Sequence, residues 1–244
     1  MRNNLSKLLK KSWEILLDCI YPRRCAICDR TITGHNGICR WCEPGVRFVE
    51  EPVCMKCGKH VKNQTEIFCY DCKRTVKAFN RGFAVFEYEY IKESLFKFKY
   101  SGRAEYSSFY ADMTAKRLGE TFAQLGIEAF VPVPIHRKRY AKRGYNQAEE
   151  YAKELSRLTG IGVKSKWIAR AVNTAPLKKM GNQDRQKNLE KAFKLNRNDV
   201  KLEKVCIVDD IYTTGATINR IARLLREQGV KEVYFVTIAI GKGL

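Results

Sequence analysis

Apolar and polar residues are distributed along the chain in a pattern that predicts strands separated by helices. Short apolar runs, rich in β-branched and aromatic residues, predict strands at 82–90, 129–134, 167–174, 205–208 and 232–240. Apolar residues recur at helical spacing between these runs, which predicts helices at 91–99 and 107–125 and after Gln147 and Thr217. Strands that alternate with helices indicate an α/β fold with a parallel sheet flanked by helices.

Two further stretches stand apart from this pattern. Pro132 and Pro134 argue against a central ladder position near the end of the strand at 129–134. The strand at 167–174 runs out into a polar loop at 176–188, and order resumes at Ala192 and Phe193. A loop of this length in a compact domain is usually functional.

The first 22 residues carry an amphipathic helical pattern that ends at Pro22. Its apolar face is formed by Leu5, Leu8, Leu9, Trp13, Leu16, Leu17 and Ile20. One interpretation is a basic helix on a membrane surface or a partner, which would give peripheral membrane association. The other is a helix packed on the protein's own core, and the acidic residues Glu14 and Asp18 favour it.

The charge of the chain narrows the classes of partner. Its 244 residues contain 46 Lys and Arg against 26 Asp and Glu, a formal net charge of +20. Such a field favours polyanions, namely nucleic acid, phosphorylated ligands or an acidic membrane surface. The alternative is a basic protein whose charge serves only solubility.

The cysteines are concentrated in one region. Eight of the ten lie in four Cys-x-x-Cys pairs: Cys25 and Cys28, Cys39 and Cys42, Cys54 and Cys57, Cys69 and Cys72. A secreted protein would use them as disulfides. The chain shows neither a secretory signal nor an apolar stretch of about 20 residues, so we expect a cytoplasmic protein with zinc ligands. Cys19 and Cys206 lie in apolar runs and are expected in the core.

The spacing of the pairs predicts two closed metal sites. Two pairs supply the four thiolates of one tetrahedral zinc, which leaves no open position and makes the site structural. Ten residues separate the first two pairs and eleven the last two, which suits one hairpin per site and sequential pairing. A cross-braced arrangement remains open, because eleven residues also separate Cys42 from Cys54. The predicted division is a helix at 1–22, a double zinc-ribbon module at 23–78 and an α/β domain at 79–244.

The strand at 205–208 leads into the most informative motif. Asp209 and Asp210 follow the strand, and a small-residue turn, Thr213, Thr214, Gly215, Ala216 and Thr217, opens the next helix. The turn suits a phosphate, because glycine permits close approach and a helix start offers free N–H groups. The carboxylates suit vicinal hydroxyls or Mg²⁺. Together they describe a pocket for ribose 5-phosphate, and the alternative is an ordinary strand-to-helix turn.

A basic and aromatic cluster follows the strand at 129–134. It contains Arg137, Lys138, Arg139, Tyr140, Lys142, Arg143 and Tyr145, with no acidic residue. Basic groups bind phosphates and aromatic rings stack on unpaired bases, which indicates a nucleic-acid surface. A solvated basic face is the alternative. His136 either faces a ligand or is a turn residue.

These motifs resemble two related families. The stretch VCIVDDIYTTGAT resembles the phosphoribosyl-diphosphate (PRPP) signature of type I phosphoribosyltransferases. Together with LLDCIYPRRCAIC, the cysteine pairs, VPVPIHRKRYAKRGYNQA and the segment ARAVNTAP to DRQKNLEKAF, it resembles the ComF family of competence proteins, of the ComFC type. The resemblance implies a zinc ribbon joined to a phosphoribosyltransferase-like domain. It also implies a cytoplasmic protein linked to single-stranded DNA and a DNA-translocating helicase.

The resemblance also implies roles for residues. Asp209 and Asp210 would hold the ribose hydroxyls and help bind Mg²⁺, residues 213–217 the 5-phosphate, and His136 and Arg137 the diphosphate. A flexible loop would contribute Arg170, Asn173, Thr174, Arg185 and Asn188. The chain departs from the family at Leu177, where a glutamine is frequent, which weakens a role for a loop amide at that position.

Three functions are consistent with these observations. The leading one is a competence protein in DNA uptake that binds single-stranded DNA and a helicase and keeps a PRPP-type pocket. The alternative is an active phosphoribosyltransferase that transfers ribose 5-phosphate to an acceptor, although no residue pattern names that acceptor. A zinc module that only scaffolds other proteins would leave the PRPP pattern unexplained.

Overall fold

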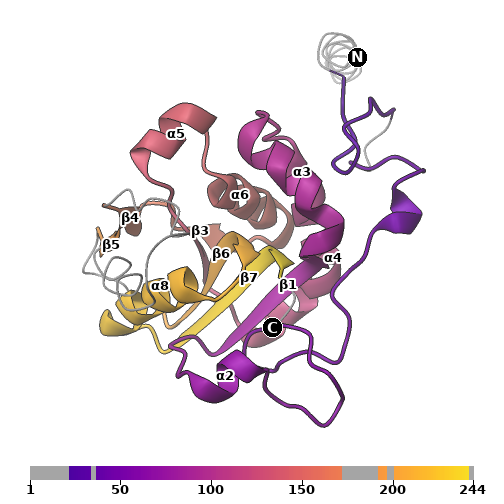
Figure 1. Cartoon of the computed structure of the whole chain (residues 1–244). Helices are drawn as coiled ribbons and strands as arrows, with labels where there is room; N and C mark the ends of the chain where they lie inside the picture. Colours follow the sequence, from indigo (N-terminus) through magenta and orange to yellow (C-terminus); the bar gives the residue numbers. More distant parts are fainter. Residues whose placement is uncertain (1–21, 34–36, 172–191, 197–200, 242–244) are drawn as a thin grey trace, which may run out of the picture. The chain divides into compact units, whose positions relative to one another are not determined.

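The structure is a computed structural model that describes residues 22–33, 37–171, 192–196 and 201–241 (Figure 1). Its contacts divide the chain into two compact units, Met1–Val46 and Arg47–Leu244. The helix predicted at 1–22 lies outside the described residues except for Pro22. The polar loop predicted at 176–188 also lies outside them.

A five-stranded sheet of order β1-β7-β6-β2-β3 forms the centre of the second unit. Its strands are β1 (Arg81–Glu87), β2 (Ala129–Pro132), β3 (Gly162–Val163), β6 (Lys204–Tyr212) and β7 (Glu232–Ile240), and every pair is parallel. Figure 1 shows the yellow β7 between the purple β1 and the orange β6. The almost unbroken burial of β7 is typical of a strand covered on both faces. The predicted parallel α/β sheet is therefore confirmed.

Pro132 occupies a position in β2 where it costs no ladder hydrogen bond. It is in register with Val208 of β6, and the next residue, Val133, donates its N–H to the Val208 carbonyl. On the other side β3 pairs only with Ala129 and Phe130, so in the described part of the chain no strand faces the nitrogen of Pro132. The expectation from the prolines is consistent with this short ladder.

Three predicted strands have different bounds or partners. The strand predicted at 82–90 is wrong at its end, because α3 (Tyr88–Tyr100) begins at Tyr88. The buried residues of α3 recur at helical spacing, and Glu89 in its first turn complements the helix dipole. The strand predicted at 205–208 continues to Tyr212 in β6. The strand predicted at 167–174 is only β4 (Ile168–Arg170), which pairs with β5 (Phe193–Leu195) in a separate antiparallel sheet.

Helices cover the sheet and complete its core. They are α3, α4 (Tyr106–Leu125), α6 (Gln147–Thr159) and α8 (Ala216–Glu227), whereas the short α5 (Arg137–Arg143) has no buried residue. The buried face of α8 packs Ile221 and Leu225 into one cluster with Val205 and Ile207 of β6. Helices α4 and α6 contact each other, and Phe122 of α4 packs edge-on against Phe130 of β2, with ring centroids 5.7 Å apart. Cys206 is fully buried, as predicted for a core cysteine.

The two cysteine-rich segments have little regular structure. The first contains a bridge between Arg24 and Thr31 and the short 3-10 helix η1 (Glu43–Gly45). The second contains a bridge between Val53 and His60 and α2 (Tyr70–Arg74). Among the described residues, no helix has both the length and the apolar character needed to cross a membrane.

Candidate phosphate-binding site and metal centres

The turn between β6 and α8 requires a glycine for two independent reasons. Gly215 has a φ of 74°, in the left-handed region that strains other residues, and it is the N-cap of α8. A Cβ atom at this position would lie 2.6 Å from Cζ of Tyr212 and closer still to its hydroxyl. The turn therefore rests directly on the edge of the Tyr212 ring.

The start of α8 offers backbone donors to an anion. Asn219 donates its N–H to the Gly215 carbonyl at 2.8 Å, which closes the first helical turn. The N-cap residue Gly215 has no side chain, and the Thr214 hydroxyl accepts the Ala216 N–H only at 3.5 Å. Thr213 and Thr214 are exposed beside it, so hydroxyl donors and first-turn N–H groups face solvent together. A phosphate fits such an arrangement of donors and helix dipole.

The two carboxylates lie within the last part of β6 and have different surroundings. Burial and the adjacent Asp210 carboxylate raise the pKa of Asp209 to about 7, while the charges of Lys99 and Arg170 oppose this rise. Asp210 pairs with Lys99 of α3, with Nζ 2.9 Å from Oδ2 and both side chains less than one-fifth exposed. The Asp210 N–H donates to Asp209 Oδ1 at 2.9 Å. The pair thus holds one carboxylate fixed by a cation and one that is easily protonated.

Cations and a neutral histidine surround these carboxylates. Arg170 at the end of β4 is close enough to Asp209 for their charges to interact, and burial and the charge of Arg139 lower the pKa of Arg170. His136 caps α5 and accepts the Lys138 N–H on Nδ1 at 3.2 Å. Burial and four nearby cations, first Arg137, lower the pKa of His136. At neutral pH this imidazole is uncharged, with its proton on Nε2.

The predicted nucleic-acid residues divide into two groups. Arg137, Lys138, Tyr140 and Lys142 are exposed on α5, and Arg139 is half-buried. Arg143 instead stacks over the Tyr100 ring at 4.7 Å and donates to Gln147. Tyr145 is half-buried and donates its hydroxyl to the Phe98 carbonyl. The exposed group can contact a strand directly, while Arg143 and Tyr145 also tie α5 to α3.

The sequence did not reveal two residues of this site, Lys99 and Tyr212. Four other predicted site residues lie outside the part of the chain that the structure describes. Asn173, Thr174, Arg185 and Asn188 of the predicted flexible loop are among the residues that the structure does not describe. Lys99 had no local signal, because its partner Asp210 is distant in sequence. Tyr212 stood next to the turn in the motif, but only the clash at Gly215 identifies it as the support of the turn.

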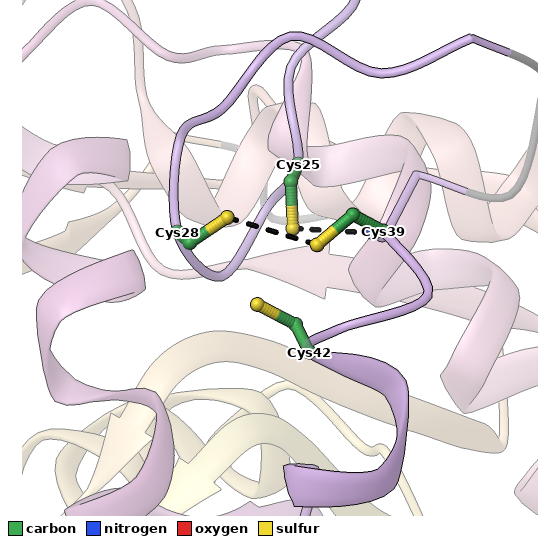
Figure 2. Close-up of side chains that lie close together, drawn as sticks. All are labelled: Cys25, Cys28, Cys39 and Cys42. Carbon is green, nitrogen blue, oxygen red and sulfur yellow. Dashed lines mark hydrogen bonds between the residues drawn. The ribbon is translucent and has the colours of Figure 1, made fainter.

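The eight cysteines form two groups of four with the geometry of zinc sites. Cys25, Cys28, Cys39 and Cys42 make one group and Cys54, Cys57, Cys69 and Cys72 the other, with the Sγ atoms of each within 4.8 Å of one another. Figure 2 shows the first group, whose side chains point toward a common centre. The Sγ atoms of Cys28 and Cys39 are 3.8 Å apart, and those of Cys57 and Cys69 3.6 Å. A tetrahedron with Zn–S bonds of about 2.3 Å has edges of about 3.8 Å.

These distances decide two alternatives that the sequence left open. None of the eight cysteines forms a disulfide, and the Sγ separations of 3.8 Å and 3.6 Å are far above the roughly 2.05 Å of a disulfide bond. Each group joins neighbouring pairs, so the predicted sequential pairing is confirmed and the cross-braced arrangement is excluded. In the second group Cys54, Cys57 and Cys69 belong to the main core cluster of buried residues.

Comparisons with known proteins agree with this architecture. Residues 16–73 match the double zinc ribbon domain, and residues 140–243 match the phosphoribosyl transferase domain. Competence protein F of Haemophilus influenzae is 30% identical over 222 residues, which cover 86% of this chain and 93% of that protein. The chain belongs to the ComF family of competence proteins.

Other ComF-family relatives align over a similar length. Competence protein ComFC of Streptococcus pneumoniae is 29% identical over 232 residues, which cover 86% of this chain and 96% of that protein. The DNA utilization protein YhgH of Escherichia coli is 28% identical over 217 residues, which cover 87% of this chain and 94% of that protein. Both alignments extend far beyond either domain alone, so the zinc ribbons and the phosphoribosyltransferase domain are shared as one unit of sequence.

Proposed function

We propose that this protein handles single-stranded DNA during DNA uptake, with a PRPP-type pocket at the carboxyl end of β6. The names of the ComF-family relatives, competence protein and DNA utilization protein, support a role in competence. One observation carries the proposal. Lys99 and Arg170 interact with the carboxylates of β6, and α5 adjoins both cations, because Arg139 interacts with Arg170 and Arg143 stacks on Tyr100, next to Lys99.

Exposed aromatic residues beside the pocket support a strand rather than a duplex. Phe96 and Tyr100 of α3 are more than half exposed, with ring centroids 5.0 Å apart, and Arg143 from the end of α5 stacks on Tyr100. Tyr140 is also half exposed. Aromatic rings next to Arg and Lys side chains suit unpaired bases, whose faces stack while the phosphates contact the cations. The chain's formal net charge of +20 favours such a ligand.

The DNA surface is tested by fluorescence anisotropy of a labelled single-stranded oligonucleotide across a salt series. Lys138→Ala with Lys142→Ala is expected to weaken binding about tenfold and to reduce the salt slope by about 1.4, because two phosphate contacts to a single strand are lost. The matched control is Lys153→Ala, since Lys153 is paired with Glu149 and Glu150 on α6. Equal losses in both variants would contradict a specific surface on α5.

The pocket is tested in the same assay with PRPP and Mg²⁺. Displacement of the DNA by PRPP is expected if strand and pocket share the end of β6. The carboxylates fit magnesium, which is usually held by one or two carboxylates together with ligand phosphates. Asp209 is the carboxylate available to the ion, because Asp210 is already paired with Lys99. Asp209→Asn should therefore reduce the Mg²⁺ dependence of displacement.

The second candidate function is transfer of ribose 5-phosphate from PRPP to an acceptor. A cavity of about 510 Å³ favours it; the cavity is lined mainly by the second zinc ribbon, including Lys59 and Asp71, and borders Glu87 and Gly241 at the carboxyl ends of β1 and β7. Gly241 donates its N–H to the Tyr212 carbonyl at the end of β6, so the cavity adjoins the strand that carries the carboxylates. Its volume is in the range of small-molecule sites.

In that reaction this chain's groups would orient the ribose and stabilise the leaving diphosphate. Asp209 and Asp210 would accept hydrogen bonds from the ribose hydroxyls, and the 213–217 turn would hold the 5-phosphate. Arg137 and the neutral His136 would donate to the departing diphosphate, whose developing charge such groups stabilise. Release of diphosphate from PRPP in the presence of a panel of nucleobases tests this function. Tight PRPP binding without diphosphate release under any acceptor would leave only the DNA-handling function.

The ComF resemblance also leads us to propose a cytoplasmic location and a DNA-translocating helicase as partner. Exposed residues of the first zinc ribbon offer a surface for a protein contact. One of them is Trp41, which lies between Cys39 and Cys42 and is 70% exposed. Co-purification of a helicase with the wild-type chain but not with Trp41→Ser would support that surface. An unchanged complex would place the contact elsewhere.

A further inference from the structure

The second cysteine group lies in the same buried cluster as Tyr212, the residue that supports the turn between β6 and α8. Cys54 and Cys57 are 1% exposed and belong to the same buried cluster as Phe79, Tyr212 and Phe235. Lys59, two residues after Cys57 on the same hairpin, places its Nζ 5.9 Å from the centre of the Tyr212 ring. The metal site and the ring of Tyr212 are thus parts of one packed region.

Tyr212 joins this region to Gly215. Its ring stacks on Phe235 of β7, with centroids 4.7 Å apart and planes 8° from parallel, and Phe79 packs edge-on at 6.4 Å. The opposite edge of the ring, with the hydroxyl, fills the space where a side chain at Gly215 would lie. The position of the glycine turn is therefore set by a ring whose other contacts come from the zinc ribbon and β7.

A second connection runs from the end of the ribbon to α8. The Ala78 N–H donates to Asn219 Oδ1 at 2.6 Å, and Arg226 Nε donates to the Ala78 carbonyl at 2.5 Å. Arg226 Nη2 also donates to Asn80 Oδ1 at 2.6 Å. One short segment after the last cysteine pair therefore holds both the first turn and the last turn of α8.

We infer that the metal bound by Cys54, Cys57, Cys69 and Cys72 positions the 213–217 turn through Tyr212, so that this turn binds phosphate only while the second zinc ribbon is intact. A small ribbon has little core without its metal, and its folding free energy comes largely from metal binding. Loss of the metal releases Phe79 and Lys59 from the Tyr212 ring, and a ring without close packing no longer fixes the turn. Tyr212 is a positioning residue, and no contact between its side chain and ligand is required.

The direct test is hydrogen exchange of the turn in the absence of any ligand. In the zinc-loaded chain the amides of 214–218 are compared with those of the variant Cys54→Ser with Cys57→Ser. We expect at least tenfold faster exchange in this segment, with the amides of α6 unchanged. The matched control is Cys25→Ser with Cys28→Ser, which removes the first metal site and should leave the turn amides unchanged. Equal exchange at 214–218 in the wild-type chain and in the second-site variant would overturn the inference.

Substitutions of Tyr212 separate positioning from loss of fold. Tyr212→Phe keeps the ring and should bind PRPP with Mg²⁺ within about twofold of the wild-type chain, whereas Tyr212→Leu should bind at least tenfold more weakly. The control is Tyr151→Leu, because Tyr151 is equally buried on α6 and its hydroxyl pairs with Thr114. This control should lower the melting temperature as much as Tyr212→Leu yet keep the affinity. Equal affinities for Tyr212→Leu and Tyr151→Leu would contradict the positioning role.

The inference rests on the proposed pocket for its ligand. The hydrogen-exchange arm needs no ligand, whereas the Tyr212 arm measures PRPP affinity, so failure of the pocket and failure of the coupling can be told apart. If the zinc-loaded wild-type chain does not bind PRPP, the proposed pocket is wrong, and the exchange arm still decides whether the second metal fixes the turn. If PRPP binds, exchange at 214–218 is unchanged by loss of the second metal, and Tyr212→Leu binds PRPP as well as Tyr151→Leu does, the pocket stands and the coupling is wrong.

Discussion

The two zinc ribbons of this protein use the same ligands at nearly the same spacing and differ in what surrounds them. In the first, only Cys25 is buried and the other three ligands are half-buried, within a unit that ends at Val46. In the second, three of the four ligands are buried in the core cluster that contains β6, β7 and α8. A Cys-x-x-Cys motif therefore predicts a metal, while the apolar neighbours of the ligands decide whether the metal supports the rest of the fold.

The largest expected effect separates the two metal sites by stability. Removing the second site with Cys69→Ser should lower the free energy of unfolding by about 3 kcal/mol or more, because metal binding supplies most of the ribbon's folding energy and the ribbon is part of the core. Removing the first site with Cys39→Ser should leave the unfolding of the sheet unchanged. Urea unfolding followed by the near-ultraviolet signal of the buried tyrosines measures both. Equal losses would mean that the two ribbons are energetically alike.

The next effect tests the turn that the second ribbon supports. Gly215→Ala combines a left-handed backbone with a clash against Tyr212, and should destabilise the chain by about 2–3 kcal/mol. Gly160→Ala is the control, since Gly160 also has a positive φ of 77° but open space around it. Its cost should be only the conformational one, about 1 kcal/mol. Thermal unfolding compares them, and similar losses would show that the turn can move away from Tyr212.

A smaller, pH-dependent effect comes from Asp209. Its pKa of about 7 in the folded chain lies above the value of an unfolded aspartate, so the folded state binds more protons and loses stability as pH rises from about 4 to about 7. The asparagine of Asp209→Asn cannot ionise, so the free energy of unfolding at pH 8 should rise by about 2 kcal/mol, a figure reduced for screening by solvent. At pH 4 it should change little, because Asp209 is then protonated.

The comparison of the ribbons sharpens this prediction. The gain from Asp209→Asn should persist when the first ribbon lacks its metal. It should shrink when the second does, because Tyr212 lies only three residues further along β6. Urea titrations at pH 4, 6 and 8 give the profile, and a gain that is constant with pH would contradict the raised pKa.

The smallest effect compares a charged side chain from each ribbon. Lys59 is 5% exposed and donates to Asp71 at 2.8 Å, so Lys59→Met leaves a partly buried carboxylate unpaired at a cost of about 1 kcal/mol. Arg40 stacks on the exposed Trp41 at 4.7 Å, and Arg40→Ala should cost about 0.5 kcal/mol or less. Differential scanning calorimetry of both variants ranks them, and the reverse order would contradict the burial argument.

Local pattern was sufficient for much of the fold. The strand predicted at 232–240 has the same bounds in β7, and the buried face predicted for α6 is present, because both signals depend on residues close in sequence. The cysteine spacing also led to the right pairing of ligands. At Tyr88 the pattern failed, since alternating aromatic and acidic residues fit a strand as well as the first turn of α3.

Only part of the candidate site could be predicted from the sequence. Asp209, Asp210 and Gly215 form a contiguous motif and could be found by inspection. Lys99 reaches Asp210 only because α3 ends beside β6, and the packing of Cys57 near Tyr212 depends on how the ribbon docks on the sheet. Contacts between residues this far apart carry no local signal, so they required the three-dimensional structure.

The strand order has a consequence for the time course of folding. Within the five-stranded sheet, β1, the first strand along the chain, lies at one edge and has β7, the last strand described, as its neighbouring strand, so Arg81 must find Tyr234. During synthesis α8 and β7 leave the ribosome long after the second ribbon. Until then the residues of α8 and β7 that pack in the same cluster as Cys54, Cys57 and Cys69 are not present. Pairings between such distant segments close large loops and form slowly. Early metal binding would keep that ribbon compact during the interval and protect its thiols until the sheet is complete.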